Sequence, residues 1–352
     1  MMSRTFLLVI YVVSFQCSSA AGNSIKTELI KAYGKAVSGD IRPILSVLES
    51  VEDVNQSEFS ALREKYEERF ITADERVEFD DPFVTNLYGL YTAYWRSSLL
   101  NPKNERKAGK ILVSGLYRLA KSEGYKATLF ESFIGPNIKK LELFLGIAAR
   151  GKGYYVLMGR TPPLRELIIW TKEEGQTYEV ELPSESFSVD VVFVQGLLSR
   201  GWLGYATFDK SHAGGWCFGG PIYRVGPKPG DNNEWFRVSL LGHEGRHMSD
   251  GKRYEKVDGW ILEYRAKLTE LVLAETTLWN LLNQFKSEAQ DDISIPHSYA
   301  SYQLINDLMG ELAQGQKTES FHTFRFTDYS KDRLKDAAEL LLDKNTKSLE
   351  AK

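Results

Sequence analysis

The hydrophobic pattern changes period near residue 154, and this change limits the fold more than any other feature of the sequence. From residue 25 to about residue 122, apolar residues recur three or four positions apart, as at Ile41, Ile44 and Leu48, which is typical of amphipathic helices. Between residues 154 and 193, β-branched or alternating runs follow, separated by Gly, Pro and Ser, and these indicate strands. Helical spacing then returns after residue 232. The sequence therefore predicts an α+β fold.

The strand-like region predicts a small, twisted, mostly antiparallel sheet. Its expected strands are 154–158, 167–170, 178–182 and 187–193, with two short strands at 215–218 and 222–225. Residues 173–176, which include Gly175, are expected to turn between two of these strands and form a hairpin. The strand at 215–218 precedes a strongly helical segment, and it is expected either to be an edge strand lining a cleft or to be a plain turn with a packed tryptophan.

The first 21 residues have the composition of a targeting segment. Arg4 supplies a positive charge, residues 6–15 form an apolar run too short to span a bilayer, and residues 18–21 are the small ones that a signal peptidase needs. This pattern predicts a signal peptide, export to a secreted or periplasmic location, and no stable membrane span after cleavage. A lipoprotein anchor at Cys17 and a retained N-terminal anchor are the alternatives.

Composition and charge limit how the fold can be stabilised and which partners it can bind, and the sequence patterns divide the chain after the signal segment into three regions. Without the signal segment one cysteine is left, Cys217, so no intramolecular disulfide can stabilise the fold, and a chain with 43% hydrophobic residues must rely on its core. A formal net charge of -3 without a long basic block argues against nucleic acid as a partner. The patterns suggest a helical N-terminal region (22–150), a core of strands followed by helices (151–285) and C-terminal helices (286–352) that end in a solvated tail (344–352).

The helical segment that starts near residue 232 contains the motif His243-Glu244-Gly245-Arg246-His247. Residues four apart share one face of a helix, so both imidazoles can point at a single ion. This H-E-x-x-H pattern predicts zinc ligation by His243 and His247, with Glu244 as the general base. The alternative is a helix whose two histidines are capped or exposed.

A catalytic zinc site needs a third protein ligand and an open position. The sequence disfavours the extended motif with a third histidine, because Asp250 and Arg253 occupy the positions where it needs glycine and histidine. The next predicted helix, 260–274, offers Glu263, which is sixteen residues after His247 (263 minus 247). We expect Glu263 to be the third ligand, and Asp258 is the alternative.

The motif His243-Glu244-Gly245-Arg246-His247, followed by Glu263-Tyr264-Arg265-Ala266, resembles the gluzincin branch of the zincin metallopeptidases. The spacing is similar to that of the ImmA/IrrE-type peptidases, and the resemblance covers about residues 212–275. It implies a zincin-like fold and a zinc-dependent peptidase with His243, His247 and Glu263 as ligands. This chain has Lys267 where many gluzincins carry an aspartate that orients a ligand histidine; Asp250, Asp258 and Glu270 are the candidates to replace it.

These expectations define the predicted function. The protein is expected to be an exported Zn²⁺-dependent metallopeptidase that acts on a peptide or protein substrate. His297 and Tyr302 are the candidates for a group that stabilises the oxyanion during catalysis. The alternatives are a catalytically inactive zincin-like module that binds peptides or proteins at the cell envelope, and a helical scaffold whose histidine pair is incidental. The pattern makes no prediction of the oligomeric state.

Overall fold

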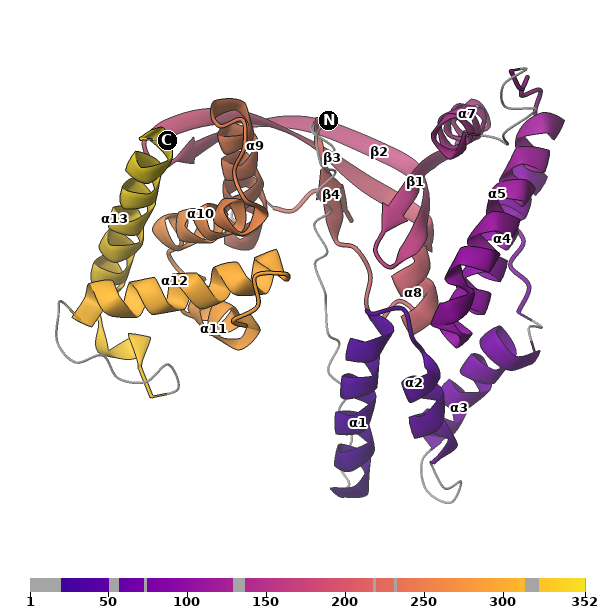
Figure 1. Ribbon diagram of the computed structural model, residues 1–352, viewed down its shortest axis with the longest axis horizontal. Coiled ribbons are helices and arrows are strands. Elements are labelled where there is room, and N and C mark those ends of the chain that lie inside the picture. The colour runs from indigo at the N-terminus through magenta and orange to yellow at the C-terminus, as the bar shows by residue number, and fades with distance from the viewer. Residues whose placement is uncertain are drawn as a thin grey trace.

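The computed structural model describes residues 20–50, 57–72, 75–128, 137–217, 220–230, 233–313 and 323–351. Two groups of helices lie on either side of a sheet whose longest strands arch from one group to the other (Figure 1). The mixture of helices with one sheet confirms the predicted α+β class. The predicted signal segment lies outside the described residues except for Ala20 and Ala21, where the first helix begins.

The N-terminal group of helices begins and ends where local signals predict. The fourth helix starts at Pro82, and the side chain of Asp81 accepts a 2.7 Å hydrogen bond from the backbone N–H of Phe83, which satisfies a free donor of the first turn. Aromatic residues such as Tyr91 and Trp95 then fill the core between the helices. The elements are α1 (Ala20–Ala36), α2 (Arg42–Glu49), α3 (Ser57–Tyr66), η1 (Glu67–Thr72), α4 (Pro82–Leu100), η2 (Pro102–Asn104), α5 (Glu105–Ser122) and α7 (Ile138–Gly151).

The sheet has five strands, in the order β1-β2-β3-β5-β4. All neighbours are antiparallel except β3 and β5, so the prediction of a mostly antiparallel sheet is confirmed. The short helix α8 (Gly201–Thr207) follows the third strand, and β4 is one edge of the sheet. The strands are β1 (Tyr155–Thr161), β2 (Leu164–Leu182), β3 (Glu185–Arg200), β4 (Gly215–Cys217) and β5 (Ile222–Val225).

The predicted turn at residues 173–176 is wrong, because β2 continues through it. Glu174 pairs with Phe193, and Gly175 pairs with Val192 on β3. Since β3 supplies a partner at each of these positions, the ladder of hydrogen bonds outweighs the local preference of glycine for a turn. The chain reverses instead between β2 and β3 at Pro183 and Ser184, where Ser184 has a φ of 68°.

The second group of helices contains the motif and follows the sheet. The predicted motif helix is a continuous helical segment, whose first part is a π-helix and whose second part begins at His243. The tail predicted at residues 344–352 is helical as far as Glu350, and Arg265 donates hydrogen bonds to Asn345 and Thr346 within it. The elements are η3 (Phe236–Gly242), α9 (His243–Arg253), α10 (Gly259–Leu273), α11 (Leu278–Glu288), α12 (Pro296–Ala313), η4 (Phe326–Asp328) and α13 (Lys331–Glu350).

Each helical group has its own hydrophobic core, and the first one extends past residue 150 to Ala206 in α8. The tip of the β2–β3 hairpin contacts the second group through Glu185, whose carboxylate accepts hydrogen bonds from Arg246 at 2.6 Å and from Ser249 at 2.8 Å on α9. The motif helix is therefore held against the sheet. Across the described ranges, no helix has both the length and the hydropathy that crossing a bilayer requires.

Candidate metal centre

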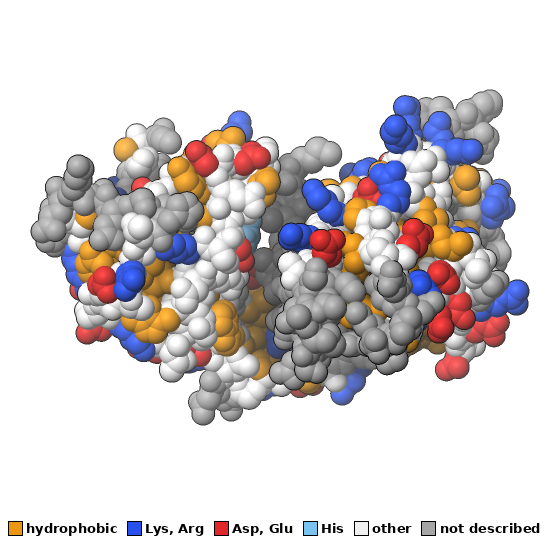
Figure 2. Space-filling model, turned by 90° about the horizontal axis from the view of Figure 1, so that it is seen from below, with side chains coloured by type: hydrophobic (Ala, Val, Ile, Leu, Met, Phe, Trp, Pro, Cys, Tyr) orange, Lys and Arg blue, Asp and Glu red, His pale blue; other side chains and the backbone are white. Residues whose placement is uncertain are grey.

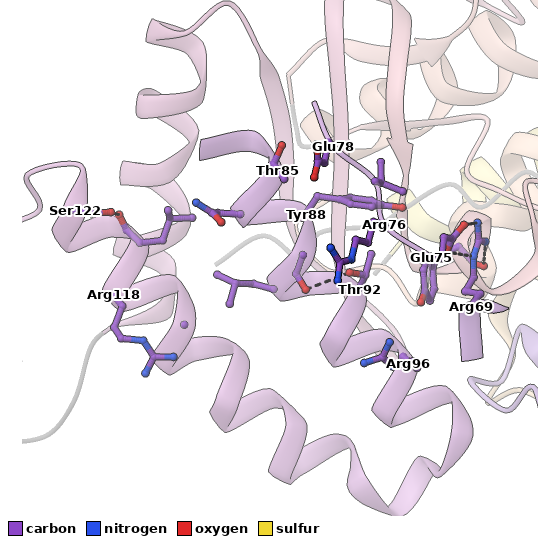
Figure 3. Close-up of a pocket in the computed structure, with 17 residues that line it drawn as sticks. Arg69, Glu75, Arg76, Glu78, Thr85, Tyr88, Thr92, Arg96, Arg118 and Ser122 are labelled. Atoms are coloured by element: carbon purple, nitrogen blue, oxygen red, sulfur yellow. Dashed lines mark hydrogen bonds and ion pairs between the residues drawn. The ribbon is translucent and has the colours of Figure 1, made fainter. Parts of the chain in front are cut away.

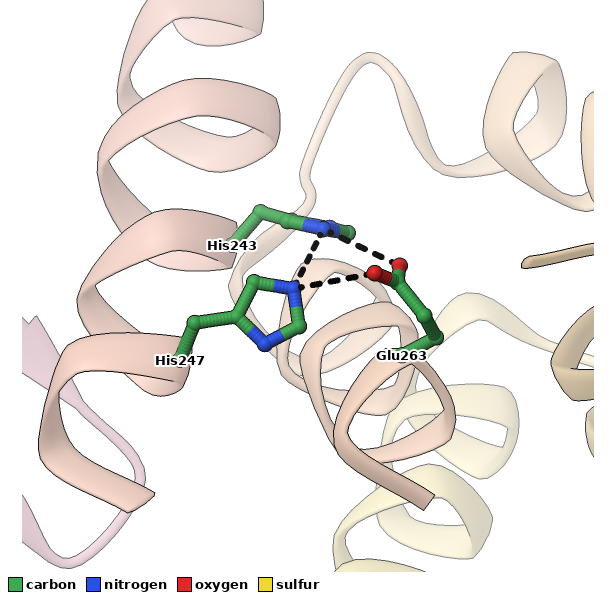
Figure 4. Close-up of side chains that lie close together, drawn as sticks. All are labelled: His243, His247 and Glu263. Atoms are coloured by element: carbon green, nitrogen blue, oxygen red, sulfur yellow. Dashed lines mark hydrogen bonds and ion pairs between the residues drawn. The ribbon is translucent and has the colours of Figure 1, made fainter. Parts of the chain in front are cut away.

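Three side chains from two neighbouring helices converge in the second helical group (Figure 4). His243 and His247 lie one turn apart on α9, so both rings leave the same face of that helix. Glu263 lies in the second turn of α10 and points back at them. Histidine, cysteine, aspartate and glutamate are the usual metal ligands, and in the described part of the chain these three residues form a group of that kind that could hold one ion.

The three side chains lie close enough together to share one metal ion. Nε2 of His243 lies 3.1 Å from Nε2 of His247. Oε2 of Glu263 lies 3.5 Å from the His243 nitrogen, and Oε1 of the same carboxylate lies 3.4 Å from the His247 nitrogen. Ligand atoms that each lie about 2.0 to 2.1 Å from a tetrahedral ion are about 3.3 Å from one another. The two imidazole nitrogens are close to this spacing, and the carboxylate faces each ring with one of its oxygens (Figure 4).

The charge distribution of this cluster favours a cation. Burial by itself lowers the pKa of His243, but the carboxylates of Glu270 and Glu263 outweigh this effect and raise the pKa to about 10. Burial by itself raises the pKa of Glu263, but the two imidazoles hold it well below its ordinary range. One carboxylate oxygen of Glu263, Oε2, is buried without a hydrogen-bond partner among the described residues. A bound cation would satisfy this oxygen.

Glu270 orients one of the two histidines. Its carboxylate lies 2.7 Å from Nδ1 of His243, and the Glu270 side chain is buried. A proton on Nδ1 that is donated to this carboxylate leaves Nε2 with its lone pair directed at the cluster, as a metal ligand needs. Of the three acids that the sequence offered for orienting a histidine of the motif, Glu270 is the one that contacts His243.

The other two acids have different surroundings. Asp250 is buried and receives two hydrogen bonds from the guanidinium of Arg265, at 2.7 and 2.9 Å, which links α9 to α10. Asp258, the alternative third ligand, is exposed at the start of α10 and is not part of the cluster. Of the two candidates, only Glu263 lies within reach of the histidines.

The α9 and α10 helices pack against each other. A Cβ atom on Gly242, the last residue of η3 directly before α9, would come within 2.7 Å of a methyl group of Leu273 at the end of α10, so the Leu273 side chain would have to move if a larger residue replaced the glycine. This packing brings Glu263 on α10 near the histidine pair on α9.

The predicted catalytic residues have different relations to the cluster. Glu244 is buried on α9, and its Oε1 has no hydrogen-bond partner in the described part of the protein. His297 on α12 borders the cluster, with Nε2 3.6 Å from Oε2 of Glu263, and 44% of its side chain is exposed. Burial, together with the positive charge of Lys267, lowers the pKa of His297 and favours the neutral ring. Tyr302, also on α12, stacks on Tyr299.

Glu288 at the end of α11 is a neighbour of the site that the sequence patterns do not indicate. Its Oε2 is buried without a hydrogen-bond partner in the described ranges, 3.8 Å from Nδ1 of His297 and 3.5 Å from the ammonium group of Lys267. The position of α11 against α10 and α12 creates this contact, so no local pattern could have found it. The site therefore has a polar side formed by His297, Glu288 and Lys267.

The site has a route to solvent. Of the three side chains, His247 is the most accessible, at 18% exposure. Figure 2 shows a hollow between the two halves of the molecule in which histidine atoms are visible.

Comparison of the chain with protein-family models, with curated proteins and with solved structures found no match.

Proposed function

We propose that this protein is an exported zinc-dependent peptidase, in which His243, His247 and Glu263 hold the metal ion. The observation that carries this proposal is the convergence of the three side chains: the two Nε2 atoms lie 3.1 Å apart, and the two Glu263 oxygens lie 3.4 and 3.5 Å from them, one oxygen beside each ring. In addition, the buried Oε2 of Glu263 has no hydrogen-bond partner among the described residues. Two imidazoles and one carboxylate are a ligand set that zinc peptidases use, and they leave one position open.

The side chains around the ion have distinct tasks in this proposal. When bound, zinc supplies a Lewis acid that makes water a nucleophile near neutral pH. The unpartnered Oε1 of Glu244 accepts the proton of the attacking water and returns it to the leaving amine. His297, neutral and at the border of the cluster, donates a hydrogen bond to the carbonyl oxygen as negative charge develops on it. Glu270 holds the His243 ring in the tautomer that ligates.

Metal analysis of the purified full-length protein tests the ligand set. We expect stoichiometric zinc in the wild type and in Asp258→Ala, and loss of zinc in Glu263→Ala with the circular dichroism spectrum retained. Asp258→Ala is the matched control, because this acid is exposed outside the cluster. The proposed site would be refuted if the wild-type protein holds no zinc after incubation with the ion. It would also be refuted if Glu263→Ala retains zinc and Asp258→Ala loses it.

Peptide cleavage tests the activity separately. A mixed peptide library analysed by mass spectrometry should show new termini with the wild type and none with Glu244→Gln, which keeps all three ligands and loses the proton acceptor. Equal cleavage by both proteins would show that Glu244 is not the proton acceptor. Zinc binding without cleavage by the wild type would favour a peptide-binding module over an enzyme.

A further inference from the structure

A second cavity lies in the N-terminal helical group, in the half of the molecule that does not contain the metal centre. It has a volume of about 660 Å³, within the usual range for sites that bind small molecules. Its walls come from α4, from α5 and from the segment that precedes α4, as Figure 3 shows. The proposed peptidase gives this cavity no task.

The cavity is lined by four arginines and two glutamates. Arg69 is already neutralised, because its guanidinium forms two 2.6 Å contacts with the Glu75 carboxylate. The other three arginines, Arg76, Arg96 and Arg118, form no ion pair with a carboxylate of the described residues. Only Glu78 remains to balance them, which leaves an excess of two positive charges (three minus one).

The three arginines come from different elements and line the same cavity. In Figure 3 Arg118 from α5 lies on the left of the view, whereas Arg96 from α4 and Arg76 both lie right of centre. A guanidinium offers a planar set of donors that matches carboxylate and phosphate groups. Three such groups along one cavity, balanced by a single carboxylate, create a positive potential that favours an anion.

Apolar side chains form the rest of the wall. Leu90 and Tyr88 on α4 and Leu119 on α5 line the cavity beside the arginines. Such a wall contributes nothing to the binding of an inorganic anion, because that ion has no apolar surface. An organic anion can bury its hydrocarbon or aromatic part against the wall. We propose that this cavity binds a small organic anion, a carboxylate or phosphate ester with an apolar body.

Anilinonaphthalene sulfonate is a suitable probe, because it joins an anionic group to an aromatic body and fluoresces when it leaves water. We expect saturable binding to the full-length protein, with competition by inorganic phosphate. The double variant Arg96→Ala/Arg118→Ala should raise the Kd at least about tenfold, which corresponds to about 1.4 kcal/mol. The control variant Arg106→Ala removes an exposed arginine of α5 that does not line the cavity, and it should bind as the wild type does.

A second variant fills the cavity without removing charge. Gly89 lines the cavity on α4, and a Cβ atom added to it meets no atom within 4 Å. Leucine also favours helix more than glycine does, so Gly89→Leu should fold and block the probe. Gly34→Leu on α1, another open helical glycine outside the cavity, is its control and should leave binding unchanged.

Three results would overturn the inference. They are no saturable binding to the wild type, binding to Gly89→Leu as tight as to the wild type, and equally tight binding to the arginine double variant. All of these measurements are made with the metal-free protein, so they do not depend on whether the chain is a peptidase.

Discussion

The hydrogen bond between Glu270 and His243 gives the sharpest test of the metal centre. The carboxylate lies 2.7 Å from Nδ1, and the Glu270 residue is 4% exposed, so little water competes with the contact. Glu270→Gln keeps a carbonyl acceptor at this position and removes the negative charge. A hydrogen bond to a charged group contributes about 1.5 to 3 kcal/mol and a neutral one about 0.5 to 1.5, so the change should cost about 1.4 kcal/mol, or roughly tenfold in zinc affinity.

Glu270→Ala should weaken zinc binding further, toward about a hundredfold, because the ring then loses its orientation as well as the charge. Both values can be measured by competition with a chromogenic zinc chelator at constant pH. Glu255→Gln is the matched control, since Glu255 is an exposed acid between α9 and α10. If both Glu270 variants bind zinc as tightly as the control, the proposed orientation of His243 by Glu270 is wrong.

Three further perturbations test the fold around the two sites. Burial raises the pKa of Glu166 from 4.5 to about 7, so its protonation stabilises the folded state fully below about pH 4.5 and this contribution is lost as the pH rises through about 7. The unfolding free energy of the wild type relative to Glu166→Gln should therefore fall by about 3 kcal/mol between pH 4.5 and pH 8, and a difference that does not change with pH would contradict the assignment. Asp250→Ala leaves the buried guanidinium of Arg265 without its partner and should lower the unfolding free energy by about 3 to 5 kcal/mol in urea titrations, whereas a loss below about 1 kcal/mol would mean that this pair is not structural. Glu234 accepts hydrogen bonds from the backbone N–H groups of residues 275–277 before α11, so Glu234→Ala should cost about 1 to 2 kcal/mol in the same assay, and an unchanged midpoint would refute this capping role.

Much of the architecture could be predicted from local patterns. The α+β class followed from the change of hydrophobic period near residue 154, and β4 and β5 lie where their short alternating runs indicated. The turn predicted at residues 173–176 failed for a physical reason: local turn preference is weaker than a partner strand that pairs at every position, and β3 is such a partner. The last helix continues to Glu350, into the tail predicted at residues 344–352, and Arg265, eighty positions before Asn345, donates a hydrogen bond to it there.

The sequence by itself determined that His243 and His247 point the same way, since a spacing of four on an α-helix leaves no other arrangement. Only the tertiary structure decided between Glu263 and Asp258 as the acid that meets them. That choice depends on how α9 packs against α10, and α9 is also held in place by its contact with the tip of the β2–β3 hairpin. The arginine-lined cavity is likewise a product of packing, because its walls come from segments that no local pattern relates to one another.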